Sequence, residues 1–262
     1  MALYRAEALL VEIRDLHERD RIVGFLSAEH GLRRGVAKGA RAKYSRYAGQ
    51  LQPLAKIDVR WFQAEGRDLG RLSDVALLRA PRGLGDDLEG LLLTAYLADL
   101  MATFAQAHEP APRLYRLLDT TLDALADGVE RALAVRYVEI WTLRLEGVFP
   151  APIECPLCGH RFAEGEVAYL APEDDALICA DCARAATAGW EGGPLDGLLQ
   201  VSAEALDVLR RSARASLTQL AAAPPPARVV REIERLCARV RRAFLQDELR
   251  SYRVLHQTLG SL

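Results

Sequence analysis

Residues 8–26 read ALLVEIRDLHERDRIVGFL, two apolar segments on either side of a polar turn. In the first segment Leu9, Val11 and Ile13 alternate with other side chains, which predicts that these three share one face of a strand. The segment at 22–26 supplies a second strand after the turn, since apolar runs bounded by polar turn residues are typical of β-structure.

The same pattern recurs in the rest of the first 80 residues, at 32–36, 57–61 and 69–78. Five short strands are too few for a sandwich and enough for a small closed barrel. We therefore predict a five-stranded oligonucleotide-binding (OB) barrel over residues 1–80, with Trp61 in its core.

Beyond Ala80 the apolar spacing becomes helical, so the fold class predicted is α+β multidomain. The barrel is followed by an all-α domain over residues 81–262, which contains an inserted module at 150–192. Helices are expected at about 88–108, from Pro112 to about Leu125, and at about 128–145, 202–221 and 227–249.

One stretch of the predicted barrel is strongly basic, although the whole chain has a net charge of −2. No Asp or Glu occurs between Glu29 and Asp58, and Arg33–Arg46 falls on the third strand and the connection after it. Such a stretch suits a polyanion such as DNA, and a solvated loop is the alternative. The candidate DNA-binding cations are Arg33, Arg34, Lys38, Arg41, Lys43 and Arg46.

Two tyrosines lie beside these cations. Tyr44 and Tyr47 would either stack on nucleic-acid bases or pack against their own domain.

Four cysteines form two C-x2-C pairs, Cys155 with Cys158 and Cys179 with Cys182. This spacing favours one structural Zn²⁺ ion in a closed Cys₄ shell. Disulfides are disfavoured in a chain without a secretory signal, a redox pair needs a strand-to-helix context that the sequence does not indicate, and an iron–sulfur cluster fits paired knuckles less well. His160 is an alternative ligand.

The last predicted helix has an apolar stripe that includes Cys237, which is expected in the core, and Phe244. Its opposite side is either a solvated face or a secondary DNA-binding surface. That side carries Arg228, Arg231, Arg235, Arg239 and Arg242.

Catalytic motifs are missing from the sequence: there is no nucleophile elbow, no Walker A loop and no His-Glu-x-x-His. The sequence also offers no targeting segment and no apolar run of membrane-spanning length. We therefore expect a non-enzymatic, cytoplasmic protein without a membrane partner.

The chain resembles the RecO family of bacterial recombination mediators. The likeness rests on Ala8–Leu26, on Val36–Arg41 leading to Leu51–Leu54, and on the cysteine pairs. It implies an OB domain, a helical domain and a zinc module, with Lys38 and Arg41 matching the family's basic loop.

The resemblance also implies a function in DNA repair, in association with the nucleoid. RecO proteins bind single- and double-stranded DNA, anneal strands, act with RecR, and help RecA load onto DNA coated by single-strand-binding protein (SSB), whose acidic C-terminal tail they contact. Without the resemblance, a zinc-stabilised protein-interaction adaptor that binds no nucleic acid is the alternative.

Overall fold

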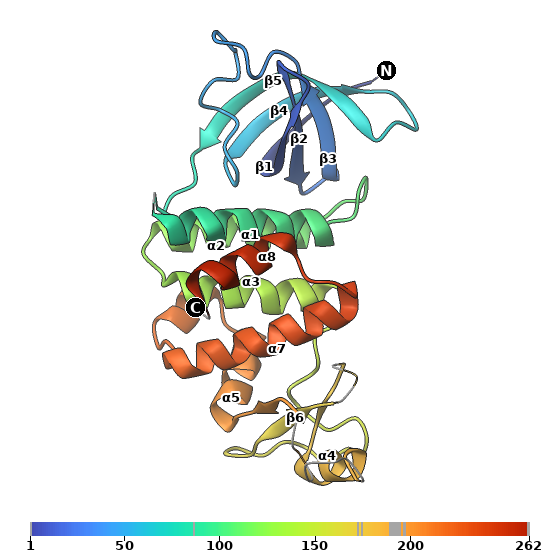
Figure 1. The fold of residues 1–262 in the computed structure, drawn as a ribbon, viewed down its shortest axis with the longest axis vertical. Helices are drawn as coiled ribbons and strands as arrows, with labels where there is room; N and C mark the ends of the chain where they lie inside the picture. Colours follow the sequence, from blue (N-terminus) through green and yellow to red (C-terminus); the bar gives the residue numbers. More distant parts are fainter. Residues whose placement is uncertain are drawn as a thin grey trace. The chain divides into compact units, whose positions relative to one another are not determined.

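The computed structural model describes residues 2–85, 87–171, 173, 175–188, 195 and 198–260. The chain divides into two compact units (Figure 1). One contains the residues up to Gly128 together with Leu249–Thr258, and the other is mainly Val129–Glu248. Local apolar periodicity could not predict that Leu249–Thr258 packs with the first unit. The predicted domain boundary at residue 80 stays a prediction.

Five strands of the first unit close into a barrel with the neighbour order β1-β2-β3-β5-β4 (Figure 1). The parallel pair β3–β5 completes the closure and sets Val36 beside Arg71. The predicted five-stranded OB-type barrel and the α+β class are thereby confirmed. The strands are β1 (Ala2–Leu16), β2 (Asp20–Ser27), β3 (Gly31–Ala37), β4 (Lys56–Gln63) and β5 (Leu69–Arg79).

Three helices belong to this unit, and α1 begins with a side-chain cap, since the Asp87 carboxylate accepts from the Gly90 N–H at 2.7 Å. Such a cap satisfies an N–H group that has no partner within the helix. Every helix in the described part of the chain is too short or too polar to cross a bilayer. The three are α1 (Leu88–Phe104), α2 (Pro112–Ala126) and α8 (Arg250–Leu259).

Strand β1 is buried on two faces. A register shift follows Leu10, whose side chain belongs to the barrel core. Leu9 and Val11 are also buried but lie outside that cluster, and Val11 lines a groove against α1. The prediction that Leu9, Val11 and Ile13 share one face is therefore wrong, because helix packing buries the outer face of the strand and Ile13 packs against the inner cluster.

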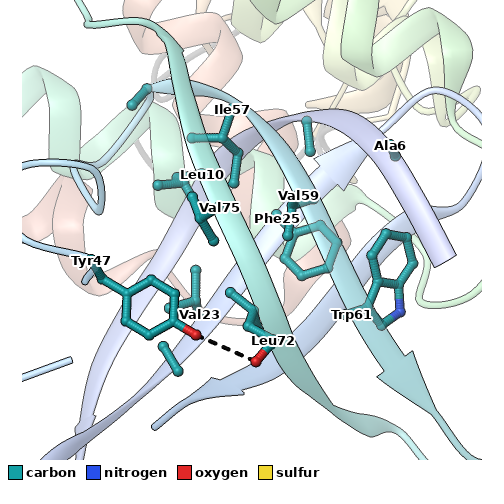
Figure 2. Packing of buried hydrophobic residues seen from close by; sticks show 13 residues of the cluster. Ala6, Leu10, Val23, Phe25, Tyr47, Ile57, Val59, Trp61, Leu72 and Val75 are labelled. Atoms are coloured by element: carbon teal, nitrogen blue, oxygen red, sulfur yellow. Dashed lines mark hydrogen bonds between the residues drawn. The ribbon is translucent and has the colours of Figure 1, made fainter. Parts of the chain in front are cut away.

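The barrel core is filled by inward side chains of all five strands (Figure 2). Trp61 is fully buried, as predicted, and its indole N–H donates to Oε1 of Gln63 at 3.0 Å. Tyr47, from the connection between β3 and β4, completes the cluster; its hydroxyl donates to the Leu72 carbonyl at 3.3 Å (Figure 2).

Two sets of contacts bind the helices to the barrel within the first unit. The α1–α2 connection runs beside β3, where the His108 N–H donates to the Leu32 carbonyl at 3.3 Å. On α2, Asp119 accepts from Lys56 at 3.0 Å and from Arg79 at 2.6 Å. These half-buried ion pairs join β4 and β5 to the helix.

The second unit contains a helical part and a small three-stranded sheet in the order β7-β6-β8. Buried apolar residues of the sheet, such as Leu170 and Ile178, give the cysteine module a core of its own. The sequence indicated only a polar segment here. The elements are α3 (Arg131–Leu145), β6 (Ala168–Leu170), β7 (Leu177–Ile178), α4 (Ala180–Ala186), β8 (Gln200–Val201), α5 (Ala203–Ser212), α6 (Leu217–Ala221) and α7 (Ala227–Leu245).

Several predicted helix boundaries were wrong. The helix expected to continue to about His108 ends at Phe104. The segment expected as one helix over 202–221 is divided into α5 and α6, because Ser216 begins a new helix with a capping box. The final helix ends at Leu245, where Gln246 adopts a left-handed conformation (φ 57°), and α8 follows.

Candidate nucleic-acid interface and metal centre

The basic stretch begins on β3 and continues into the connection to β4, as predicted. We call residues 38–50 the basic loop. Backbone hydrogen bonds fold it into successive turns, from Ala42 N to Gly39 O (3.1 Å), Ser45 N to Ala42 O (3.0 Å) and Ala48 N to Ser45 O (3.1 Å). The basic loop therefore has a defined backbone conformation and is not an unstructured connection.

The basic loop is attached to the barrel at both of its ends. The Gly39 N–H donates to the Asp20 carboxylate at 2.8 Å, and the Arg41 N–H donates to the Arg19 carbonyl at 2.9 Å. Near the other end, Tyr47 inserts its ring into the barrel core and is only 3 % exposed. Tyr47 is thus a packing residue, the second of the two alternatives for the tyrosines.

The two predicted cations on β3 are engaged by protein groups. Nε of Arg33 donates to the His30 carbonyl at 3.1 Å, and its guanidinium contacts Nδ1 of His108. Burial lowers the pKa of Arg33. Arg34 pairs with Glu12 on β1 at 2.6 Å. Both positive charges remain in the field of the barrel, but each guanidinium already contacts a protein group.

The four predicted cations of the basic loop are exposed. Lys38 forms no hydrogen bond or ion pair with any residue that the structure describes. Arg41 donates to the His17 carbonyl at 3.0 Å, while Arg46 donates to the Tyr47 hydroxyl at 2.6 Å and stacks on its ring at 4.8 Å. Lys43 lies over the ring of Tyr44.

Two further cations join this surface, and the linear pattern did not single them out. Arg19 is exposed in the β1–β2 turn, next to the backbone of Arg41. Arg71 is exposed on β5 beside Val36, at the end of β3. Only the barrel's closure brings Arg71 there, so no local signal predicted it.

The five predicted cations of the C-terminal stripe lie on α7 in the second unit. Arg228, Arg231, Arg235 and Arg242 are exposed, and Arg239 is half-buried. Arg228 forms an ion pair with Glu204. The DNA-binding role of this stripe stays a prediction.

The opposite side of α7 differs from the prediction at two positions. Cys237 is buried, as predicted, whereas Phe244 is 47 % exposed. Arg241, by contrast, is fully buried, and it pairs with Glu139 at 3.0 Å and with Glu248 at 2.8 Å. A cation on the core side of a helix had no signal in the sequence pattern.

The four predicted metal ligands lie together in the second unit. All four sulfurs are within 4.8 Å of one another, and those of Cys158 and Cys179 are 3.7 Å apart. All four cysteines are free of disulfides. A tetrahedral ion with Zn–S bonds of about 2.3 Å separates its sulfurs by about 3.8 Å. An iron–sulfur cluster would spread its cysteines further, because they bind different irons.

The local structure directs the sulfurs inward. Gly159 adopts φ +71° and donates its N–H to the Cys155 carbonyl at 2.8 Å, which closes the first knuckle. Burial raises the pKa of the Cys155 thiol, but backbone N–H groups directed at its sulfur bring the pKa down to about 7. Lowering a thiol pKa favours the thiolate, the form that binds metal. The donor set and its spacing therefore fit a single ion.

Two other expectations concern this centre. Cys179 follows β7 and is the N-cap of α4, so a strand-to-helix context is present after all. A simple redox pair nevertheless does not account for the convergence of all four sulfurs. His160 is not part of the sulfur cluster; its Nε2 contacts Glu166 at 2.7 Å.

Comparison with known proteins identifies the family to which the chain belongs. Residues 1–81 match the family model described as Recombination protein O N terminal, and residues 85–253 match Recombination protein O C terminal. The DNA repair protein RecO of Anaeromyxobacter sp. (strain K) is 34% identical over 220 residues, which cover 83% of each chain. That of Anaeromyxobacter sp. (strain Fw109-5) is 33% identical over 92% of this chain and 89% of its own. That of Koribacter versatilis (strain Ellin345) is 25% identical over 94% and 96%, respectively. The chain therefore belongs to the RecO family.

Proposed function

We propose that this protein is a DNA-binding recombination mediator that acts in DNA repair without catalysing a reaction. The observation that carries the proposal is the basic loop, a folded and exposed cationic element on a closed OB-type barrel, in a chain of the RecO family. The main phosphate contacts are assigned to Lys38, Arg41, Lys43 and Arg46. Arg33 and Arg34 contribute to the positive field of the barrel.

Strand annealing by such a surface needs no catalytic group. Two complementary strands repel each other through their phosphates, and cations that neutralise phosphates lower this repulsion and release condensed counterions. Exposed side chains on a folded loop are suited to this role, because they reach phosphates without unfolding the barrel. Bases remain free to pair.

The partners follow from the family. We propose that the protein works with RecR, contacts the acidic tail of SSB and thereby helps RecA to load onto single-stranded DNA, in the cytoplasm. The cations of the α7 stripe offer a second surface for acidic or phosphate groups. Of these, Arg231 and Arg235 are exposed and lie one turn apart on the helix.

The proposed cofactor is one structural Zn²⁺ ion, held by Cys155, Cys158, Cys179 and Cys182. Zinc would supply folding free energy and no reaction step, because four thiolates fill its coordination shell. For Cys155→Ser, native mass spectrometry should show loss of one zinc equivalent, and thermal unfolding should show a less stable second unit. Cys237→Ser, which alters a cysteine outside the cluster, should keep the ion. Wild-type protein without an ion in zinc-replete, reducing buffer would contradict the assignment.

The DNA proposal is tested by anisotropy titration of a fluorescent single-stranded oligonucleotide at several salt concentrations. In the double variant Lys38→Ala/Lys43→Ala, the slope of log affinity against log salt should fall by about 1.4, at about 0.7 per lost phosphate contact. Neither side chain forms a hydrogen bond or ion pair to another described residue, so stability should not change.

Two controls make the titration specific. Arg161→Ala/Arg184→Ala removes the same charge from the cysteine module and should leave the slope unchanged. Arg33→Ala should lower the unfolding temperature, because it removes the contacts to His30 and His108, with a smaller effect on the slope. Salt-independent binding, or an unchanged slope in the double variant, would refute the proposal and favour a protein-interaction adaptor.

A further inference from the structure

We propose that Tyr44 is a stacking site for an unpaired base and gives the basic loop its preference for single-stranded DNA. The inference rests on the proposed function and adds to it a class of ligand and one residue that selects it. Its starting point is a contrast between two tyrosines three positions apart. Tyr47 is 3 % exposed, whereas Tyr44 is 89 % exposed.

The exposure of Tyr44 is extreme among large apolar side chains. The other exposed large hydrophobic residues among those described range from 36 % to 66 % exposed. Tyr44 has no ring partner in the described part of the chain and no hydrogen bond there. Its ring therefore contributes little to folding, and both its faces are open apart from the approach of Lys43.

The basic loop fixes the backbone that carries this ring before any ligand arrives. Tyr44 lies within the turn that the Ser45 N–H closes, just before the turn that the Ala48 N–H closes, and three residues before the anchor Tyr47. Gly39 and Gly49 have positive φ angles of 71° and 73° and bound the segment. A tyrosine on a preformed loop loses only two side-chain torsions on binding, so stacking costs little conformational entropy.

One cation lies at the Tyr44 ring, and a second lies two residues further along the basic loop. Nζ of Lys43 lies 5.6 Å from the Tyr44 ring centroid, and the Arg46 guanidinium lies 4.8 Å from the centroid of Tyr47. A strand whose phosphates contact these cations therefore carries its bases past the Tyr44 ring. Base stacking on an aromatic side chain is tolerant of sequence, because every base has a π-face.

Duplex DNA cannot use this site at the same cost. Its bases are already stacked on their neighbours, so one would have to be unpaired and extruded, which costs a few kcal/mol. Duplexes are held by the cations alone, whereas single strands gain the cations and the ring. The selectivity thus comes from Tyr44 and the general affinity from the charges.

The experiment compares three ligands of equal length at one salt concentration: oligo(dT), a single strand with abasic sites in place of bases, and a duplex. Wild-type protein should bind oligo(dT) at least about fivefold more tightly than the abasic strand, the lower limit for one stacked base. Tyr44→Ala should remove that difference and leave abasic and duplex binding unchanged. Tyr44→Phe, which keeps the ring, should behave like wild type, and Lys43→Ala should weaken all three.

The results separate this inference from the function on which it rests. If wild-type protein binds none of the three ligands, the proposed function fails. If it binds all three but Tyr44→Ala changes nothing, or weakens all three alike, the proposed function stands and the stacking site is refuted. Unfolding temperatures of the two Tyr44 variants should match wild type, because the ring has almost no contacts to lose.

Discussion

A buried ionic network between α3 and α7 offers a severe test of the packing of the second unit. Glu139, 1 % exposed, pairs with Arg136 at 2.9 Å and with Arg241 at 3.0 Å. Arg136 also pairs with Glu234 at 3.2 Å, and Arg241 with Glu248 at 2.8 Å. Glu139 is the only member of these pairs, among the described residues, that bridges both arginines.

The substitution Glu139→Gln keeps the size of this side chain and removes its charge. The new amide presents an N–H₂ group to one of two guanidinium groups that are themselves donors, so one buried arginine loses one of its two acceptors. Each arginine keeps its other carboxylate, so the cost is that of one buried, charged donor left without an acceptor, about 1–3 kcal/mol. For a protein of this size about 2–4 °C is expected per kcal/mol, so the unfolding temperature should fall by about 2–12 °C.

The assay is thermal unfolding followed by far-UV circular dichroism, with Asp207→Asn as the matched control. Asp207 pairs with Arg211 one turn away on the surface of α5, and that exposed pair contributes about 0–1 kcal/mol. A shift for Glu139→Gln no larger than that of Asp207→Asn would refute the network as described.

Three other substitutions test contacts of the first unit by chemical or thermal denaturation. Gly31→Ala should destabilise by at least about 1–2 kcal/mol, because φ is +59° and the new Cβ would lie 1.8 Å from the Glu109 carbonyl oxygen; an unchanged midpoint would contradict this contact. Asp119→Asn should cost about 1–3 kcal/mol at neutral pH. Burial alone would lower the pKa of Lys56, but the pair with Asp119 outweighs burial, so the pKa is raised in the folded protein. The stabilisation by this ion pair is therefore complete below the lysine pKa of an unfolded chain and is lost as pH rises through the folded pKa. The stability difference between wild type and Asp119→Asn should therefore shrink as pH rises above about 10.4, and a difference that grows there would contradict the ion pair. Tyr47→Phe should cost about 0.5–1.5 kcal/mol for each of the two hydrogen bonds of the hydroxyl, to the Leu72 carbonyl and from Arg46, while Arg46 keeps its charge and DNA affinity falls little; a large loss of affinity would show that Tyr47 does more than anchor the loop.

Local pattern was sufficient for the barrel and the cysteine centre. Strand alternation, turn residues and cysteine spacing are encoded by neighbours in the chain, since each follows from a repeat of two or from two residues between ligands. Five strands, the buried Trp61 and four converging sulfurs were therefore predictable. Helix ends were less so, because the capping box at Ser216 and the left-handed Gln246 divide segments of continuous apolar spacing.

The roles of single side chains needed the tertiary structure. Arg33 and Lys38 are equivalent in a count of charges, yet one contacts His30 and His108 while the other is free among the described residues. Arg71 joins the basic surface only because β5 pairs in parallel with β3.

The sequence by itself determined that the chain forms a five-stranded barrel, a helical part and a Cys₄ centre, and that positive charge gathers near residues 33–46. The tertiary structure decided which of these charges are exposed, which tyrosine anchors the loop and which projects, and where Arg241 is buried. The physical reason is that periodicity records only which faces are apolar. Partners are set by contacts between residues far apart in the chain, such as Arg241 with Glu139.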